Sequence, residues 1–316
     1  MVFVIKKPDL VRLSDATLGA FARVPPSETL DHLLRYLSTW SGSDKLFMVI
    51  QYGAKVLVPI LQFKARLQHR AGMRGKPTSD VAASLKKFAS LVSDARALWG
   101  MWGILPIVQW LISLERSPPP TRRLLTIERT QGWAMLAFYP LDHLYYLITH
   151  DLMSPTLSLP FANSISKRPP GIQQLRLDSA KISRWSTRFW AVYVILQLIH
   201  LREDRALLLR RQKALKKARG LEHANMKKQW EGWYNELAVN LAYFPLTIHW
   251  SLDKGLFKNN IWVDLLGLAA ALASFRGGWK ATALPASSSL PLEPVEEIAG
   301  IASSEKPEEV QDSYSA

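Results

Sequence analysis

Apolar positions recur at helical spacing along most of the chain, and they define the helices that we expect. Between residues 28 and 40, four leucines fall at intervals of three and four on one face of a helix, and Ser27 is positioned as its N-cap. The polar run Ser41-Gly42-Ser43-Asp44 interrupts this pattern, which resumes over residues 44–64. We therefore predict an N-terminal helical hairpin over residues 28–64, in which Gly42 makes the turn and Ser43 or Asp44 caps the second helix.

The next helical segment, residues 81–99, is amphipathic and follows a polar loop in which Ser79 or Asp80 is the expected N-cap. Its apolar side chains fall within an arc of about 120°, while Lys86 and Lys87 lie outside that arc. Such a face can pack on other helices of the protein, or lie in a bilayer interface with its lysines near lipid phosphates. The periodicity alone favours packing within the protein.

Four further apolar segments follow, and each is short or interrupted for a membrane span. The last of them has the small residues that suit helix packing and is the best candidate span. Proline-rich stretches separate the segments and predict irregular loops, notably over residues 153–181. The pattern as a whole predicts an all-α, membrane-associated helical bundle. The four segments are residues 100–114, 133–150, 185–201 and 261–279.

Composition supports contact with a membrane surface. Many of the 12 Trp residues flank apolar segments, where amphipathic rings suit a membrane interface. Residues 1–280 carry 39 Lys and Arg against 19 Asp and Glu, whereas residues 281–316 carry one Lys and seven acids. No zinc-finger spacing, RNP-like motif or basic zipper accompanies the basic charge, so an anionic membrane is a better partner than nucleic acid. We expect a helical domain at 1–280 and a disordered acidic tail at 281–316.

A basic run at residues 202–228 contains ten Lys and Arg. It is either a solvated helix, a surface that binds anionic lipid, or an internal address that an import receptor reads. Its densest part comprises Arg210, Arg211, Lys213, Lys216, Lys217 and Arg219.

The sequence offers no motif for catalysis or for a cofactor. Phosphate-binding loops, dinucleotide-binding glycine motifs, HExxH helices and nucleophile elbows are absent, and the chain has no cysteine. Two groupings of histidine and acidic residues come nearest to a site, and we interpret both as structural. We therefore expect no enzymatic activity, no metal and no cofactor. The two groupings are His143 and His150 with Asp142 and Asp151, and His200 with Glu203 and Asp204.

Four motifs in the chain resemble those of the peroxin-11 family, which are membrane proteins that elongate and proliferate peroxisomes. Residues 28–52, ETLDHLLRYLSTWSGSDKLFMVIQY, closely resemble the N-terminal signature of the family. The other motifs are FYPLDHLYYL (138–147), SRWSTRFWAVYVILQLIHLRED (183–204) and LAVNLAYFPLTIHWSLDKGLF (237–257). The long, Trp-rich form looks most like the fungal C-type branch. The resemblance implies a location in the peroxisomal membrane.

Family members use an amphipathic helix after the N-terminal block to insert into and curve the bilayer, and the matching position here is 81–99. The resemblance implies that Lys86 and Lys87 contact lipid phosphates. It also implies association with further copies of the chain, with related family members and with dynamin-type fission machinery. The membrane-inserting face that it implies comprises Val81, Leu85, Phe88, Val92 and Trp99.

Two other classes of function stay open on the sequence. In a membrane channel or metabolite carrier, His143, Asp142 and Asp264 would line a path. In a soluble scaffold, all of the amphipathic faces would be core.

Overall fold

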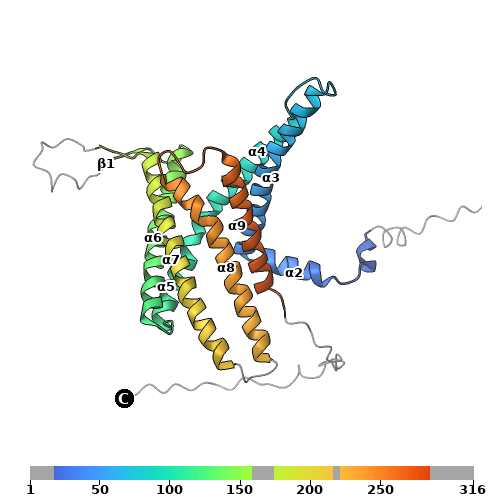
Figure 1. Cartoon of the computed structure of the whole chain (residues 1–316). Helices are drawn as coiled ribbons and strands as arrows, with labels where there is room; N and C mark the ends of the chain where they lie inside the picture. Colours follow the sequence, from blue (N-terminus) through green and yellow to red (C-terminus); the bar gives the residue numbers. More distant parts are fainter. Residues whose placement is uncertain (1–17, 159–173, 216–220, 285–316) are drawn as a thin grey trace, which may run out of the picture. The chain divides into compact units, whose positions relative to one another are not determined.

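Helices make up most of the structure. The computed structural model describes residues 18–158, 174–215 and 221–284 (Figure 1). The described helices belong to one compact unit, the first of two, which ends at Thr282, and the predicted tail lies almost entirely outside the described residues. The helices of the first unit are α2 (Glu28–Leu37), α3 (Trp40–Arg70), α4 (Asp80–Trp99), α5 (Ile104–Arg116), α6 (Arg122–Thr149), α7 (Ser179–Ala214), α8 (Leu221–Ser251) and α9 (Asn260–Ala281), with single 3-10 turns η1 (Ala20–Arg23) and η2 (Gly100–Gly103).

The prediction of an all-α fold is confirmed, with one small addition in the connection between α6 and α7. We expected this connection to be irregular, but two three-residue strands, β1 (Thr156–Ser158) and β2 (Gln174–Arg176), pair antiparallel in it. The Leu177 amide donates to the Pro155 carbonyl, 2.7 Å away, and extends the pairing by one hydrogen bond. The pair brings the two ends of the connection together and adds no sheet to the core.

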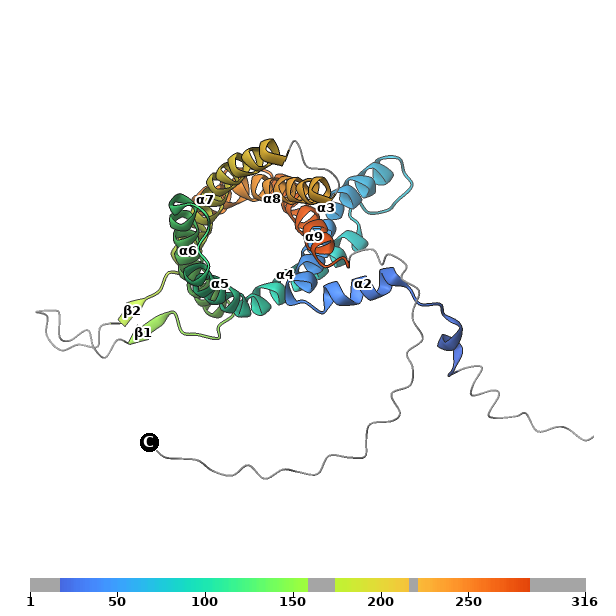
Figure 2. The same ribbon diagram turned by 90° about the horizontal axis from the view of Figure 1, so that it is seen from below.

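Most helices pack on their neighbours in the chain. Helix α6 packs on α7, α7 on α8 and α8 on α9, and α4 continues through η2 into α5, which packs on α6. The exception is α9, which packs on α3 and so joins the last helix of the unit to one of the first. Figure 2 shows the helices following one another in this order.

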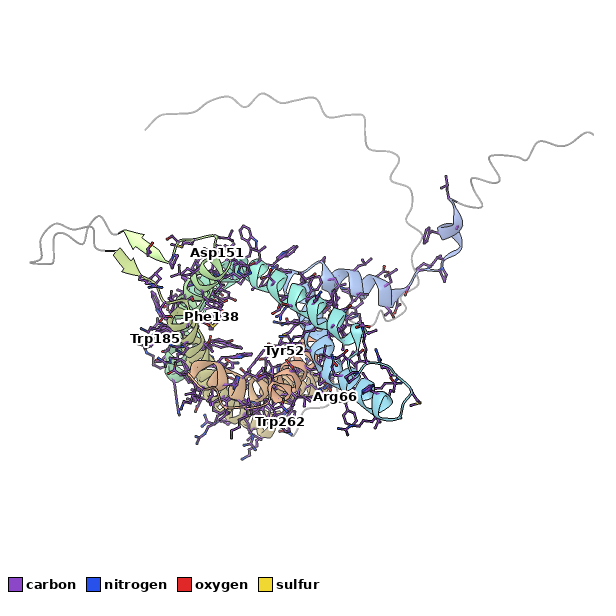
Figure 3. The ribbon with its side chains drawn as sticks, turned by 90° about the horizontal axis from the view of Figure 1, so that it is seen from above. Tyr52, Arg66, Phe138, Asp151, Trp185 and Trp262 are labelled. Carbon is purple, nitrogen blue, oxygen red and sulfur yellow. The ribbon has the colours of Figure 1, made fainter. Side chains whose placement is uncertain are left out.

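The core lies where α3, α8 and α9 meet. Met48 and Tyr52 of α3 pack there against Ala242 of α8 and against Ala270 and Ala271 of α9. Small residues on α9 let the backbones of α9 and α3 approach closely, as the spacing of these residues indicated. Figure 3 shows Tyr52 on the inner side of the helices.

The break between the first two helices differs from our prediction. Helix α3 already begins at Trp40, and its N-cap is Thr39, whose Oγ1 accepts from the Gly42 amide at 3.0 Å. Gly42 therefore lies inside the helix, and the proposed caps Ser43 and Asp44 lie in its first turns. Gly42 is needed for another reason: a Cβ at this position would collide with the Tyr36 carbonyl oxygen at the end of α2.

Helix α2 is also not the main partner of α3, so the predicted hairpin over residues 28–64 is wrong in its pairing. The more extensive contacts of α3 are with α4 and α9. The polar side chains of α2 reach the C-terminal end of α9 instead, where Arg35 Nε donates to the Thr282 carbonyl at 2.9 Å. His32 Nε2 lies 3.0 Å from the Trp279 carbonyl oxygen, and its ring packs on the Trp279 indole.

Helix α3 also runs further than expected. The predicted segment ended at residue 64, but the helix continues through Pro59 to Arg70. Pro140 and Pro245 lie inside α6 and α8 in the same way. Since proline costs about 3 kcal/mol in an isolated helix, contacts with neighbouring helices must offset its effect.

The close approach of α9 to α3 gives a testable prediction. A Cβ at Gly267 would collide with Cε1 of the Tyr52 ring, whereas nothing lies within 4 Å of a Cβ at Gly53, another helical glycine. We expect Gly267→Ala to destabilise the protein by about 1–3 kcal/mol through overpacking, and the matched control Gly53→Ala to stabilise it by up to about 1 kcal/mol. Thermal unfolding of the two variants in detergent, followed by circular dichroism, measures both. A Gly267→Ala variant as stable as Gly53→Ala would contradict the packing described.

Candidate membrane-binding surface

Helix α4 presents one face to α3 and another to the outside. It begins where predicted, because the Ser79 side chain accepts from the Ala82 amide at 3.3 Å and caps the helix. Ala82, Ala89 and Val92 are buried. Two alanines on this face allow α4 to pack closely against α3.

The five residues of the implied membrane-inserting face do not share one environment. Val81, Phe88 and Trp99 are 67%, 48% and 61% exposed. Leu85 is half-buried and Val92 is only 8% exposed. An arc of about 120° is wide enough for one of its edges to face α3 while the other faces outward.

Exposed apolar side chains extend well beyond these residues. They continue along η2 and α5, and a second row lies on the second half of α3. Soluble proteins rarely expose so many large apolar side chains together, which indicates a lipid or protein partner. The additional exposed residues are Leu91 and Leu98 on α4, Trp102, Leu105, Val108 and Ile112 after it, and Leu57, Ile60, Phe63 and Leu67 on α3.

Three helical stretches in the described part of the chain are long and apolar enough to cross a membrane. They are Trp40–Arg70, Asp80–Arg116 and Asn260–Ala281. The second joins the amphipathic helix to the apolar segment 100–114, which sequence analysis treated as two elements. That interpretation missed the continuity: the 3-10 turn η2 follows α4 directly and leads directly into α5.

The predicted apolar segments 133–150 and 185–201 are not among these stretches, since polar side chains interrupt both. Those side chains connect α6 to α7. Gln131 Nε2 donates to Gln197 Oε1 at 2.6 Å, and Ser186 Oγ donates to Asp142 Oδ1 at 3.5 Å. Asp142, Ser186 and Gln197, which interrupt the predicted apolar segments, therefore form hydrogen bonds between α6 and α7.

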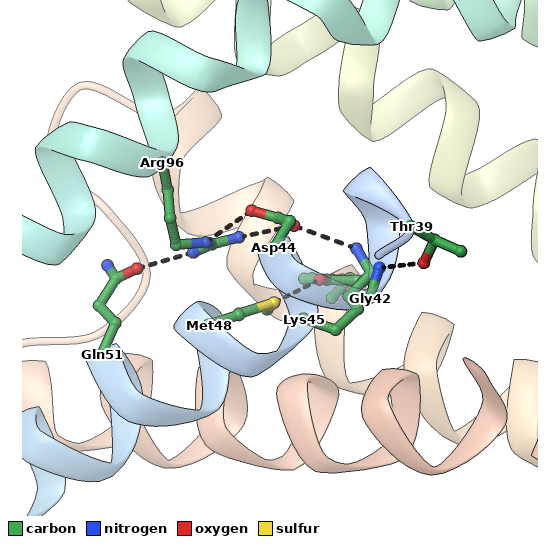
Figure 4. Close-up of polar contacts among 8 residues, drawn as sticks. Thr39, Gly42, Asp44, Lys45, Met48, Gln51 and Arg96 are labelled. Carbon is green, nitrogen blue, oxygen red and sulfur yellow. Dashed lines mark hydrogen bonds and ion pairs between the residues drawn. The ribbon is translucent and has the colours of Figure 1, made fainter. Parts of the chain in front are cut away.

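An ion pair fixes α4 on α3 (Figure 4). Arg96 Nε donates to Asp44 Oδ1 at 2.8 Å, and Arg96 Nη2 donates to Asp44 Oδ2 at 3.3 Å. Arg96 Nη1 donates to Oε1 of the buried Gln51 at 2.7 Å. This two-point contact sets both the register and the rotation of α4, and so decides which of its residues face outward. Sequence analysis assigned no role to Arg96, since a single Arg among apolar positions carries no spacing signal.

A largely apolar groove of about 580 Å³ lies between α4 and the start of α3, above this ion pair. Phe88, Leu91 and Trp99 line it from α4, and Trp40 and Phe47 line it from α3. The groove therefore joins the exposed side chains of both helices into one surface. We call these five residues, with Val81 and Leu98, the α3–α4 apolar surface.

The two lysines of α4 are exposed but lie in different surroundings. Lys86 lines a cleft of about 650 Å³ with Lys55 and Asp264, between α3, α4 and the ends of α8 and α9. Lys87 does not line that cleft. Lys87 is therefore the better candidate of the two for contact with lipid phosphates.

The basic cluster lies at the end of α7. Arg210, Arg211 and Lys213 are exposed there. Lys216, Lys217 and Arg219 lie outside the described residues, so their place is not assigned.

The first histidine and acid grouping separates in the structure, and the second does so in part. His150 Nε2 lies 2.7 Å from Asp94 Oδ1 and ties the end of α6 to α4, while Asp142 contacts Ser186 on α7. Glu203 pairs with Arg123. Within the described ranges, no group of three or more His, Cys, Asp or Glu side chains is arranged to hold a metal ion.

His200 joins α6 to α7 with a partner that sequence analysis missed. Its Nδ1 lies 2.8 Å from Asp204 Oδ2, and its Nε2 lies 3.1 Å from Glu128 Oε1. Burial lowers the pKa of His200, but the hydrogen bonds to Asp204 and Glu128 outweigh it and raise the pKa above its usual value. The imidazolium can donate to both carboxylates at once, which the neutral ring cannot do.

Two exposed tryptophans mark one end of the helices. Trp185 lies in the first turns of α7 and Trp262 in the first turn of α9, and Figure 3 shows both on the outer side. The two helix starts lie at the same end, because Arg184 Nε pairs with Asp253 Oδ1, 2.8 Å away, in the loop before α9. Exposed indoles at one level suit the interface between lipid and water.

Comparison with known proteins finds similarity to one family. The family model described as Peroxisomal biogenesis factor 11 (PEX11) matches residues 30–166. The Peroxisomal membrane protein 11 homolog of Dictyostelium discoideum is 21% identical over 200 residues, which cover 63% of this chain and 64% of the relative. No solved structure matches. Over the matched residues, the chain is similar to the peroxin-11 family.

The matched region begins in α2 and includes the α3–α4 apolar surface, η2, α5 and α6. Of the four motifs that carry the resemblance, those at 183–204 and 237–257 fall outside the family-model match. The chain spans just under two thirds of the Dictyostelium relative. Both matches indicate a protein of the peroxisomal membrane, and the three apolar helical stretches of the chain are consistent with that location.

The His200 contacts make stability depend on pH. Because the pKa of His200 is raised in the folded state, its charged form stabilises the protein fully below about pH 6.5, its usual unfolded value, and this stability is lost as the pH rises through the folded-state pKa. We expect His200→Asn to cost about 1–3 kcal/mol at pH 5.5 and less at pH 8.5. Thermal unfolding of both proteins at the two pH values gives the difference. A cost that stayed constant or grew with pH would contradict the charged pairing.

Proposed function

We propose that the protein curves and elongates the peroxisomal membrane, and so promotes peroxisome proliferation and fission, by inserting the α3–α4 apolar surface into one leaflet. The supporting observation is that one face of α4 packs on α3 while another apolar face is exposed. Its alanine face and Arg96 hold it on α3, while Val81, Phe88 and Trp99 remain exposed. Shallow insertion of such an edge expands one leaflet relative to the other and favours curvature.

The geometry changes the mechanism that the sequence suggested. Instead of a separate amphipathic helix, the inserting unit is the edge of a helix pair, so that Phe47 and Trp40 of α3 enter the bilayer with α4. Val92 is buried and contributes to holding the pair together. Lys87 stays at the level of the lipid phosphates on an anionic surface.

Association would concentrate this effect. We propose that further copies of the chain and related family members gather in the curved region and that dynamin-type fission machinery acts there. The exposed Arg210, Arg211 and Lys213 at the end of α7 are our candidates for contact with anionic lipid or an import receptor.

Replacing the apolar edge tests the proposal. We expect Phe88→Ser with Leu91→Ser to abolish tubulation of anionic liposomes by the full-length protein, because the polar edge no longer inserts. In cells that lack the natural protein, the same variant should leave peroxisomes few and enlarged. Leu241→Ser is a matched control, since Leu241 is a similarly exposed leucine (53%) on α8. Electron microscopy of the liposomes and fluorescence microscopy of peroxisomes are the two readouts.

Charge supplies a second arm of this test. Lys87→Glu should weaken binding to anionic liposomes, while the exposed Lys228→Glu on α8 should have a smaller effect. Wild-type tubulation by the serine variant, or equal loss in the Leu241→Ser control, would overturn the insertion mechanism.

One observation favours a second function, a channel or metabolite carrier. Asp264 lines the 650 Å³ cleft with Lys55, on two helices that are apolar enough to cross a membrane. His143 and Asp142, which we expected on the same path, do not line this cleft. Of the three residues in that hypothesis, Asp264 is the one that lines the cleft.

Solute flux into proteoliposomes distinguishes the two functions. If the protein conducts solutes through the cleft, Asp264→Asn should lower the flux at least about tenfold, because a charge that lines a path in a low-dielectric medium controls entry. Asp253→Asn, in the loop before α9, is the control and should leave the flux unchanged. Flux that is absent in the wild type, or equal in both variants, would exclude this path.

A further inference from the structure

A second cavity, of about 320 Å³, lies between α2, the start of α3, α7, α8 and α9. It is separate from the α3–α4 apolar surface and from the Asp264 cleft. Polar and charged side chains line it, although the helices that form it are largely apolar. Its size is at the lower end of cavities that hold small ligands.

One hydroxyl in the wall of this cavity has no partner. Tyr36 is only 2% exposed, and no group in the described part of the chain hydrogen-bonds to its hydroxyl. The hydroxyl faces the backbone of Gly278, where a Cβ would lie 2.7 Å from it. Since buried polar groups are nearly always paired, this unpaired hydroxyl indicates that another molecule supplies its partner.

Two opposite charges face the same cavity. Lys45, in the first turns of α3, lines it with Ser41, and its Nζ lies 3.5 Å from Asp44 Oδ2. Glu236 lines it from α8 and has no ion pair within 4 Å among the residues described. Burial raises the pKa of Glu236, while Lys45 opposes that shift. A ligand that carried both charges would neutralise the two groups together.

Aromatic rings line the cavity beside Glu236. Trp190 and Tyr243 meet edge to face with ring centroids 5.3 Å apart, and Tyr193 lies next to them on α7. Such a corner of aromatic faces next to a carboxylate is the arrangement that proteins use to bind quaternary ammonium groups.

The geometry points to a binding site for a phosphate ester of an alkylammonium alcohol, the chemistry of the phosphocholine headgroup. The ammonium lies against Trp190, Tyr243 and Glu236. The phosphate lies near Lys45, Ser41 and the Tyr36 hydroxyl, which donates to a phosphate oxygen. Glu236 is partly buried and partly exposed, so the cavity is open to the outside at this residue, and its volume admits a headgroup but leaves acyl chains beyond it.

Titration calorimetry of the full-length protein in maltoside detergent tests this site. The ligands are dihexanoyl phosphatidylcholine, dihexanoyl phosphatidylglycerol, which lacks the ammonium, and free phosphocholine. We expect saturable binding of the choline lipid and binding of the glycerol lipid at least about tenfold weaker. Binding of free phosphocholine as tightly as the lipid would support the site with a soluble ester as its ligand, and binding of the lipid alone would support it with a membrane lipid.

Variants connect the binding to the cavity. Glu236→Gln should weaken binding of the choline lipid about tenfold and leave that of the glycerol lipid unchanged. Glu231→Gln, which removes a carboxylate from α8 outside the cavity, is the matched control. Ser274→Phe should fill the cavity and abolish binding of both lipids, and thermal unfolding shows whether that variant folds. If it does not, Glu236→Gln decides the question by itself.

Three outcomes would overturn the proposal. They are no saturable binding, which would leave a cavity filled by water only, equal binding of the choline and glycerol lipids, and wild-type affinity in Glu236→Gln. The proposal does not rest on membrane insertion, because none of its residues belongs to the α3–α4 apolar surface. Loss of choline-lipid binding with normal tubulation, or the reverse, therefore separates the two.

Discussion

The structure depends on the packing of α3 between α4 and α9. Both partners offer small residues to it, Ala82 and Ala89 from α4 and Gly267, Ala270 and Ala271 from α9, so that three helices approach closely without large side chains between them. Packing of this kind works in lipid, where burial of apolar surface gives no advantage to one apolar partner over another and close van der Waals contact decides. Van der Waals contacts between small residues do not by themselves fix the register of two helices. The ion pair between Arg96 and Asp44, together with the hydrogen bond from Arg96 to Gln51, fixes the register and rotation of α4 on α3.

This packing determines which apolar side chains remain exposed and available to a membrane. Once the alanine side of α4 lies on α3, the rotation of α4 leaves Phe88, Leu91 and Trp99 outside, next to Trp40 and Phe47 of α3. The polar residues of α6 and α7, in contrast, are used between the helices, as the Gln131 and Gln197 pair shows. The unit therefore has an apolar edge formed by α3 and α4 and a more polar set of contacts on the side of α6 to α8.

Much of the fold follows from local patterns. The helices, the loop before α4, its Ser79 cap and the small-residue face of α9 were all predicted, because spacing and capping depend on residues within a few positions of one another. The helix break near Gly42 was misplaced by the same reasoning. Several residues there could cap a helix, and Thr39 does so because α2 ends two residues earlier and its last carbonyls need the space that Gly42 leaves.

The sequence by itself determined the helical class, the apolar and basic character and the similarity to peroxin-11 proteins, since each is a property of composition or of short-range order. Only the tertiary structure decided which part of the apolar face of α4 is shared with α3, that Glu128 completes the contacts of His200, and that Tyr36 closes a cavity with residues of α7, α8 and α9. The reason is physical. A helical period defines a face, but residues far away in the chain decide whether that face meets protein or lipid.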